Sequence, residues 1–285
     1  MHTKTKGRSG QPPVSGLPDE LLDAFIRSRR DGLSPETLKF YSGFLTLAKS
    51  VVGIGVTGRE VKQFLDDLGC TNGGKHAYYR ALRAFYNWLY SSISGYGLDP
   101  QNNPMLAVEP PKVERRIMPS LTTEQIAHLV SQAENPRDQA IISLFSDSGL
   151  RLAELASIRL ENIDWQNRLI KVWCKGRKQG LAPFGAKTEA LLKEWLSFYT
   201  PDGTNIWGAD KWAIVDMLRR LRARTGLPCN AHTFRRSFAS ILAKRGVDAL
   251  HIMRLGRWES ISMVERYTRS VKFEDSLRLY TPIIS

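Results

Sequence analysis

Five residues in the second half of the chain carry the side-chain chemistry that phosphoryl transfer requires. They are Arg151, Lys175, His232, Arg235 and Tyr267. Attack on a phosphodiester by a side-chain hydroxyl needs a nucleophile, positive charge around the phosphate oxygens and an acid for the leaving oxygen. Tyr267 offers the hydroxyl, and the other four offer positive charge or protons. None of the five is diagnostic alone, so the prediction depends on the sequence around each.

The first candidate lies in the segment SGLRLAEL, residues 148–155, in which a glycine directly precedes a helical turn. Arg151 and Glu154 stand three residues apart, so we expect them on one helix face and close enough to pair. A guanidinium held by a carboxylate is oriented for two-pronged contact with phosphate oxygens. Glu154 is therefore expected to support Arg151, although a plain surface ion pair is the alternative for this segment alone.

The second candidate lies at the tip of an expected β-hairpin. Strand patterns over residues 169–174 and 181–184 flank the sequence KGRKQG, which begins at Lys175. A lysine on such a turn can place its ammonium at the leaving oxygen, and no carboxylic acid or metal site competes for that role. Basic hairpin tips are usually only solvated, and Lys178 competes with Lys175 for the active role.

The third and fourth candidates stand three residues apart at the start of an expected helix over residues 232–245. His232 can donate to one phosphate oxygen and Arg235 can neutralise another. Because Phe234 and Phe238 belong to an apolar stripe, we expect the polar pair to face away from that stripe. A histidine taken alone is more often structural.

The candidate nucleophile lies in a short helix near the C-terminus. Ser262 and Glu265 have capping-box spacing, which predicts that Tyr267 falls in an early turn. A phenol has a pKa of about 10, so nearby cations must favour the phenolate near neutral pH. Most of the nine tyrosines must pack in the core, and Tyr267 alone could do the same.

The elements that position these residues fall into two parts. Apolar periodicity predicts helices over about 17–32, 35–48, 57–68 and 75–92, with no strand pattern among them. Five prolines interrupt residues 96–120, which predicts a basic linker. Further helices over 122–133, 136–147, 188–199 and 211–224 surround the hairpin. We therefore expect a flexible basic arm over residues 1–16, a helical domain over 17–95, the linker over 96–120, and a mixed domain with a C-terminal tail over 121–285.

The composition favours an anionic partner. The 285 residues carry a formal net charge of +13 and a pI near 9.8, and nucleic acid is the commonest partner of so basic a soluble chain. Basic solubility alone or contact with acidic membranes are the alternatives. The basic residues expected on DNA are Lys75, Arg80, Arg83, Lys112, Arg115, Arg116, Arg177 and Lys178.

The cysteines and the absence of long apolar runs suggest a cytoplasmic, nucleoid-associated protein. Cys70, Cys174 and Cys229 form no CxxC pair, which argues against a disulfide framework and a structural zinc. No apolar run approaches the roughly 18–20 residues that span a bilayer, and no hydrophobic segment follows the basic N-terminus.

The ordered segments SGLRLAEL, KGRKQG, HTFRRSFAS and LGRWESISMVERYTR together resemble the tyrosine recombinase (phage integrase-like) family over about Leu121 to Arg269. That family has an Arg in a GLRxxEL-like box, a hairpin Lys, an HxxR box, a His or Trp nine residues before the nucleophile, and a Tyr. Trp258 stands where many members have histidine; its indole donates one hydrogen bond and cannot shuttle a proton. On this chain the pattern falls on Arg151, Lys175, His232, Arg235, Trp258 and Tyr267.

The resemblance implies a mainly α fold with a small β-hairpin or sheet (α+β). An N-terminal helical core-binding domain and a C-terminal catalytic domain would form a C-shaped clamp on double-stranded DNA. Tyr267 would form a 3′-phosphotyrosyl link, and Lys175 would protonate the leaving 5′ oxygen to give a free 5′-hydroxyl, without metal, ATP or other cofactor. The two arginines would neutralise the non-bridging oxygens, while His232 and Trp258 donate hydrogen bonds.

The resemblance also implies a homotetramer on paired DNA sites, with a possible accessory DNA-bending or directionality protein. The apolar tail residues Phe273, Leu277, Leu279 and Tyr280 could join a neighbouring copy or pack on their own domain. Two alternatives stay open: a type IB topoisomerase-like enzyme that relaxes DNA, and a DNA-binding protein of the same fold that does not cut. Strand exchange distinguishes the first, and a Tyr267→Phe variant that behaves like wild type would favour the second.

Overall fold

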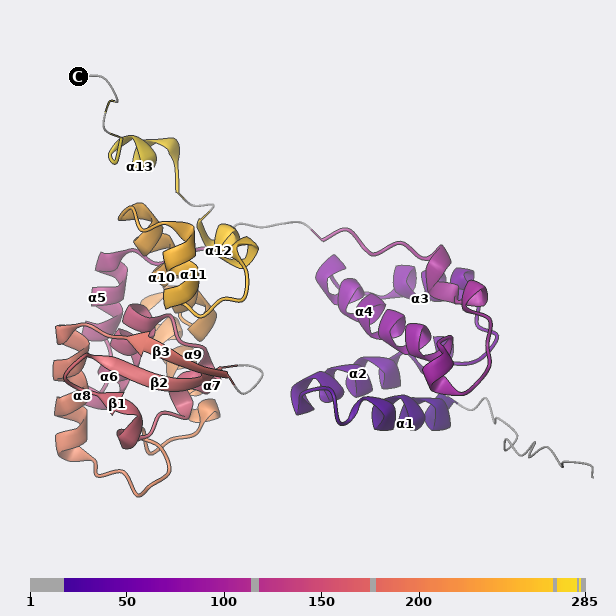
Figure 1. Cartoon of the computed structure of the whole chain (residues 1–285), viewed down its shortest axis with the longest axis horizontal. Coiled ribbons are helices and arrows are strands. Elements are labelled where there is room, and N and C mark those ends of the chain that lie inside the picture. The colour runs from indigo at the N-terminus through magenta and orange to yellow at the C-terminus, as the bar shows by residue number, and fades with distance from the viewer. Residues whose placement is uncertain (1–17, 114–117, 175–177, 269–270, 281, 283–285) are drawn as a thin grey trace, which may run out of the picture. The chain divides into compact units, whose positions relative to one another are not determined.

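The computed structural model describes residues 18–113, 118–174, 178–268, 271–280 and 282. The chain forms two compact units, Met1–Arg115 and Arg116–Ser285, each with its own apolar core. Both are built mainly of helices, and one antiparallel sheet of three short strands lies in the second unit (Figure 1). The expected mainly helical class with a small sheet is confirmed.

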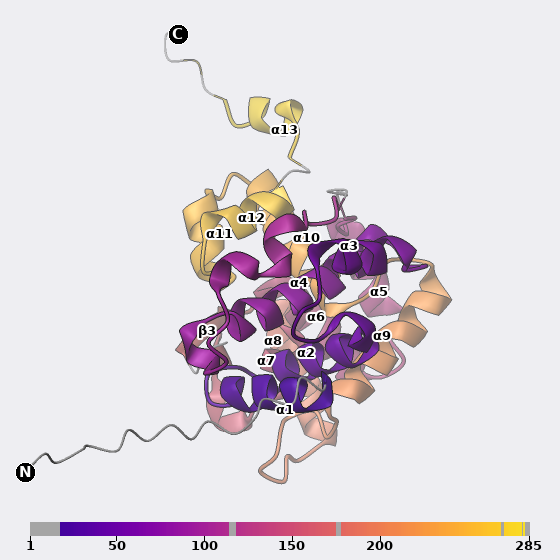
Figure 2. The same cartoon turned by 90° about the vertical axis from the view of Figure 1, so that its right-hand side faces the viewer.

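The first unit is built around the long helix α4. Its residues Leu82, Phe85 and Leu89 recur at helical spacing and are fully buried. The Phe85 ring meets the Phe25 ring of α1 edge-on, with the centroids 5.7 Å apart. Helices α1 and α2 lie side by side and both contact α4 (Figure 2). The helices are α1 (Pro18–Arg29), α2 (Pro35–Leu47), α3 (Gly58–Asp67) and α4 (Asn72–Leu89), with 3₁₀ turns at Lys49–Val51, Ser92–Ser94, Pro100–Asn102 and Pro104–Ala107.

Side-chain caps fix where these helices begin. Ser34 Oγ accepts from the Thr37 backbone N–H at 3.3 Å, so α2 starts at Pro35 as expected. Helix α4 starts at Asn72, three residues earlier than predicted. The Thr71 hydroxyl accepts from the Gly74 backbone N–H at 3.3 Å, and this cap extends the helix through two glycines of low helix propensity.

The last 3₁₀ turn of the first unit and the residue after it also belong to the first core. Met105 and Val108 are buried in it. Asn103 Oδ1 accepts from the Met105 backbone N–H at 2.9 Å, and Asn103 Nδ2 donates to Asn87 Oδ1 at 3.1 Å. The prolines of the expected linker therefore shape short turns that pack against the helices, at least as far as Val108.

The second unit encloses a core shared by helices and the sheet. The Phe145 ring of α6 stacks on the Phe234 ring of α10, with the centroids 5.7 Å apart. Helix α6 also contacts α5, α8 and strand β3. The helices are α5 (Thr123–Ser131), α6 (Pro136–Ser148), α7 (Leu152–Ala156), α8 (Ala186–Phe198), α9 (Lys211–Thr225), α10 (Ala231–Lys244), α11 (Ala249–Leu255), α12 (Ile261–Thr268) and α13 (Phe273–Leu277), with a 3₁₀ turn at Leu160–Asn162.

The sheet has the order β1-β2-β3, with antiparallel pairing throughout. Ile170 pairs with Ala182 and both are buried, while Trp173 pairs with Gln179 on the exposed face. Strand β1 (Ile163–Asp164) was not predicted, because two residues are too few to leave a period-2 pattern. Strand β2 (Leu169–Cys174) matches the prediction, whereas β3 (Lys178–Pro183) begins three residues earlier than expected.

Helices α10, α11 and α12 gather at one end of the second unit (Figures 1 and 2). A small apolar cluster joins them, with Phe238, Ile252, Trp258 and Val264 buried in it. Helix α12 begins at Ile261, so the expected start at a Ser262 cap is wrong and Tyr267 lies in the last turn. Val264, in the middle of α12, is fully buried in the cluster and packs the helix against it.

The described residues contain neither a helix that could span a membrane nor a group of side chains that could hold a metal ion. No helix among them is both long and apolar enough to cross a bilayer. Nor does the described part of the chain contain three or more His, Cys, Asp or Glu side chains grouped to hold a metal ion.

Candidate active site

A glycine turn presents the first arginine. Helix α6 ends at Ser148, and Gly149 follows with φ +56°; a Cβ there would lie 2.7 Å from a ring carbon of Phe238, so only glycine fits. Arg151 then precedes α7 and donates from Nη1 to Glu154 Oε1 at 2.6 Å. The Arg151 backbone N–H donates to Glu154 Oε2 at 3.0 Å. The predicted Arg151–Glu154 pair is therefore confirmed, and it fixes the guanidinium beside a buried carboxylate.

Arg235 is buried, with 3% of its surface exposed. It donates from Nη1 to the carbonyl of Gly149 and from Nη2 to the carbonyl of Gly256 at 2.5 Å. Its guanidinium carbon lies 4.2 Å from the centroid of the Trp258 ring, a cation–π contact. Burial, and then the charge of Arg151, lowers the pKa of Arg235 to about 10, so it stays charged at neutral pH.

The expectation that Arg235 faces away from the apolar side of α10 is wrong. The turn that ends α6 and the turn that ends α11 supply the carbonyls of Gly149 and Gly256, and the buried guanidinium donates to both.

His232 lies in the first turn of α10, which Asn230 caps by accepting from the Thr233 backbone N–H at 2.9 Å. His232 itself is exposed. Loss of water on its protein side, and then the charges of Arg236, Arg235 and Arg151, lowers the pKa of His232. The neutral imidazole is therefore favoured here near pH 7, as a donor or acceptor of hydrogen bonds.

We expect His232 to cost stability in acid. Its folded pKa lies below the unfolded value of about 6.5, so below that pH the unfolded chain binds the proton more readily. The penalty begins as the pH falls through 6.5, and it is complete below the folded pKa. His232→Gln should therefore gain stability relative to wild type from pH 7.5 to 5, in urea unfolding at each pH. His128→Gln, at an exposed position of α5, is the control, and parallel curves for wild type and His232→Gln would contradict the shift.

Trp258 and Tyr267 lie against each other at the same end of the unit. Their ring centroids are 5.5 Å apart, at an interplanar angle of 42°. Trp258 is 5% exposed, and its buried Nε1 has no hydrogen-bond partner among the described residues. The face of the indole therefore contacts the site in this conformation, while its N–H points into protein.

Burial lowers the pKa of Arg235 and of Arg236, and the phenolate form of Tyr267 would oppose that shift at both guanidiniums. Arg236 donates from Nη2 to Thr233 Oγ1 at 2.9 Å. Arg236 was not among the predicted site residues, although the doubled arginine of HTFRR was a visible signal.

A second missed residue is Arg257, whose side chain is 6% exposed. Its Nη2 lies 3.7 Å from Glu154 Oε2, the oxygen that also accepts from the Arg151 backbone N–H, while the Arg151 guanidinium donates to Oε1. No local pattern marks this residue, because its partners come from distant segments.

Lys175 lies outside the described residues. The strand end that precedes it is close to the site, however. Burial and then the charge of Glu154 raise the pKa of the Cys174 thiol, while Arg257 and the two site arginines oppose that rise. The charged groups of the site therefore also act on Cys174, the last residue of β2.

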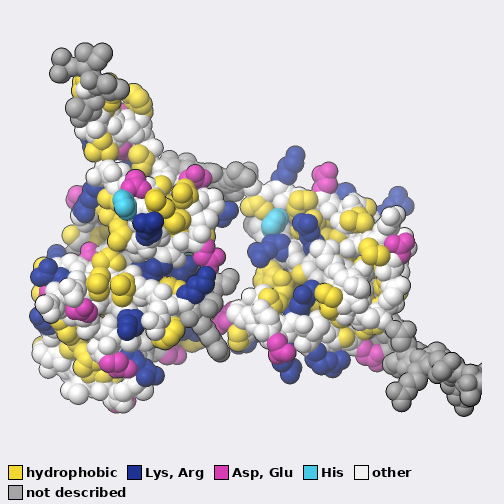
Figure 3. Space-filling view, in the orientation of Figure 1, with side chains coloured by type: hydrophobic (Ala, Val, Ile, Leu, Met, Phe, Trp, Pro, Cys, Tyr) yellow, Lys and Arg dark blue, Asp and Glu magenta, His cyan; other side chains and the backbone are white. Residues whose placement is uncertain are grey.

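The basic residues expected on DNA divide three ways. Arg115, Arg116 and Arg177 lie outside the described residues. Lys75 donates to the carbonyl of Asp66 at 2.8 Å, and the Arg80 guanidinium lies 5.4 Å from the Phe40 ring centroid, so both have partners within the first unit. Arg83, Lys112 and Lys178 are exposed. Figure 3 shows Lys and Arg side chains on the visible faces of both units.

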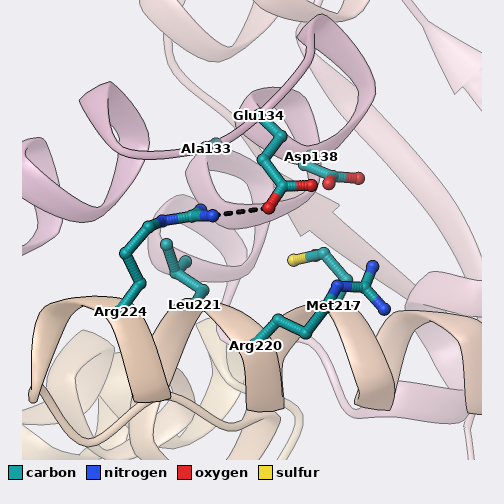
Figure 4. A pocket seen from close by; sticks show the side chains of 7 residues that line it. All are labelled: Ala133, Glu134, Asp138, Met217, Arg220, Leu221 and Arg224. Carbon is teal, nitrogen blue, oxygen red and sulfur yellow. Dashed lines mark hydrogen bonds and ion pairs between the residues drawn. The ribbon is translucent and has the colours of Figure 1, made fainter.

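One pocket of the second unit contains an ion pair and none of the candidate catalytic residues (Figure 4). Arg224 of α9 donates from Nη1 to Glu134 Oε1 at 2.5 Å and from Nη2 to the carbonyl of Gln132 at 2.6 Å. None of the candidate catalytic residues lines this pocket, so its ion pair ties α9 to the connection between α5 and α6. The lining residues are Ala133, Glu134, Asp138, Met217, Arg220, Leu221 and Arg224.

Comparison with known proteins identifies the family to which the chain belongs. The phage integrase family matches residues 119–273. Tyrosine recombinase XerC of Pseudomonas fluorescens is 30% identical over 278 residues, covering 87% of this chain and 90% of the relative. Tyrosine recombinase XerA of Saccharolobus solfataricus is 25% identical over 282 residues, covering 92% and 91%.

Solved structures share the fold. A lambda integrase(75–356) dimer bound to a COC′ core site matches with a TM-score of 0.71 at 15% identity, over 90% of this chain and 97% of that one. The Tn1549 transposon integrase in complex with circular intermediate DNA matches with a TM-score of 0.67 at 13% identity, over 92% and 99%. The chain belongs to the phage integrase family and is a tyrosine-type site-specific recombinase.

Proposed function

We propose that this chain cuts and rejoins duplex DNA at specific sites with Tyr267 as the nucleophile. The Tyr267 oxygen attacks the scissile phosphorus, and the bond from phosphorus to the 5′ oxygen breaks. The tyrosine gives up its proton and the 5′ oxygen gains one, which leaves a 3′-phosphotyrosyl link and a free 5′-hydroxyl. A 5′-hydroxyl from another strand then attacks the link and releases Tyr267, so the phosphodiester energy is conserved without metal or ATP.

The surrounding residues stabilise the charge of this transfer. Arg151 and Arg235 neutralise the non-bridging oxygens, Glu154 holds Arg151 in place, and His232 donates a hydrogen bond. Lys175 protonates the leaving 5′ oxygen.

The gathering of these side chains from separate elements carries the proposal. Burial and the charge of Arg151 both lower the pKa of His232 and of Arg235, although the whole sheet and three helices separate Arg151 from these two residues in sequence. Tyr267, on a third element, packs against Trp258, whose ring also contacts the Arg235 guanidinium. A cluster of cations around one half-buried phenol is what phosphate transfer to tyrosine requires.

Covalent trapping tests the proposal. Nicked suicide duplexes, tiled from the DNA that flanks the gene, are incubated with the protein in EDTA without nucleotide and resolved under denaturing conditions. We expect a DNA-linked band whose adduct maps to Tyr267 by mass spectrometry. An adduct on another residue would overturn the nucleophile, and binding without an adduct on any duplex would favour a DNA-binding protein that does not cut.

Trp258 supports the site through its ring. Phenylalanine keeps an aromatic face under the Arg235 guanidinium but has no N–H, whereas alanine removes both. We therefore expect Trp258→Phe to cleave within about 5-fold of wild type and Trp258→Ala to be slower by about 10-fold or more. Single-turnover cleavage of the trapped site measures both rates. Equal losses in the two variants would instead support the hydrogen bond from the indole that the resemblance implies.

Double-stranded DNA is the proposed partner, and paired sites would hold four copies of the chain. The structural relatives bound to DNA and the basic side chains on both units support the DNA contact. The tail residues Phe273, Leu277, Leu279 and Tyr280 are exposed and offer apolar surface to a neighbouring copy. Light scattering of the protein with paired sites should give a tetramer, and a monomer there would contradict the assembly. A DNA substrate implies that the protein acts on the nucleoid in the cytoplasm. Any accessory DNA-bending or directionality protein would act there too.

A further inference from the structure

Arg257 has a backbone conformation that favours glycine. It follows α11 and precedes Trp258, with φ at +57°. L-residues other than glycine, asparagine and aspartate rarely adopt this region, and they stay in it only where surrounding contacts determine the conformation. The contacts of the Arg257 side chain hold the backbone in this conformation.

The guanidinium of Arg257 bridges three separate segments. Nη1 donates to the carbonyl of Leu181 on β3 at 3.1 Å and to that of Leu255 at 2.8 Å. Nη2 donates to the carbonyl of Ser148 at 3.0 Å and lies 3.7 Å from Glu154 Oε2. The hairpin, the end of α6 and the start of α7 therefore meet at one buried side chain.

The same side chain also touches β3 through its aliphatic stem. A Cβ added to Gly180 would lie 2.8 Å from Arg257 Cδ, so the strand backbone lies directly on the stem. Glu154 is shared: Oε1 accepts from Arg151 and Oε2 faces Arg257. Arg257 thus joins β3 to the carboxylate that orients Arg151.

We propose that Arg257 is a positioning residue that fixes the β2–β3 hairpin relative to the Arg151–Glu154 pair during DNA cleavage. Cys174 pairs with Lys178 across the two strands, so the contacts that fix β3 also fix the end of β2 at Cys174. Lys175 follows Cys174 directly in the sequence. The proposal rests on the proposed function, and it assigns Arg257 to protonation of the leaving oxygen rather than to nucleophilic attack.

A pair of substrates isolates the protonation of the leaving oxygen from the other steps of cleavage. One is the suicide duplex trapped above, and the other has sulfur in place of the bridging 5′ oxygen at the scissile phosphate. A leaving thiolate has a conjugate-acid pKa of about 8.5, far below that of an alcohol, so it departs without the acid. A defect in leaving-group protonation therefore slows the oxygen substrate and spares the sulfur substrate.

Arg257→Gly removes the side chain and keeps the positive φ without strain. We expect cleavage of the oxygen substrate to fall by about 10- to 100-fold, as for a displacement of roughly 1 Å at an active site, with DNA affinity unchanged. Cleavage of the sulfur substrate should stay within about 3-fold of wild type. Equal losses on both substrates, or no loss on either, would overturn the proposal.

Arg257→Lys tests the same point should the glycine variant lack a cooperative melting transition. Lysine keeps the charge but has no planar fork for carbonyls of two segments, so the loss should again be confined to the oxygen substrate. Arg224→Lys makes the same change at the remote ion pair of Figure 4, and it should leave both rates unchanged. Failure of wild type to form a Tyr267 adduct would overturn the proposed function and this assignment together, whereas an adduct with equal losses would overturn only the role of Arg257.

Discussion

Tyr267→Phe is expected to abolish covalent capture of DNA while leaving the fold and DNA affinity intact. Phenylalanine lacks the attacking oxygen, and loss of a nucleophile lowers an enzyme's rate by more than about 10⁴-fold. The phenyl ring can still pack against Trp258, which lies 5.5 Å away between ring centroids. We therefore expect the free energy of unfolding to change by no more than about 1 kcal/mol.

The measurement is the amount of DNA-linked protein on a suicide duplex, followed beside a gel-shift titration of the same duplex. Tyr199→Phe, in the connection that follows α8, is the matched control and should form the adduct at the wild-type rate. An adduct that persists in Tyr267→Phe would assign the nucleophile elsewhere. Strand exchange by this variant would refute the tyrosine mechanism itself.

Arg235→Lys is expected to have the second-largest effect, on both catalysis and stability. Lysine cannot bridge the carbonyls of Gly149 and Gly256 as the planar guanidinium does, so at least one loses its donor. A buried carbonyl without a partner costs about 1–3 kcal/mol in the free energy of unfolding. Loss of one preorganised charge at the phosphate should lower the cleavage rate by about 100- to 1000-fold.

Urea unfolding and single-turnover cleavage separate the two effects, provided that cleavage is measured where the variant is fully folded. Arg245→Lys makes the same change at an exposed position that caps the same helix, and it should alter neither quantity. A variant with wild-type stability and slow cleavage would assign Arg235 to the phosphate alone. The reverse result would make it a purely structural residue.

The sequence alone determined the local elements and the class of protein. Helix starts follow from side chains that cap backbone N–H groups within three residues, as Ser34 and Thr122 do, so the signal is local. The fold class followed from periodicity. The class of enzyme followed from the order of four short segments, and the family match over residues 119–273 confirms it.

Only the tertiary structure decided which polar residues are buried. Periodicity showed that Arg235 and His232 share a side of α10, yet it could not show that carbonyls from two distant loops would bury Arg235. Arg257 gave no signal at all, because its partners lie on β3, α6 and α7. The start of α12 and the two-residue β1 were also missed, since packing and pairing outweigh propensity in such short elements. Local spacing records which residues share a face of an element, whereas the segments that cover that face come from elsewhere in the chain.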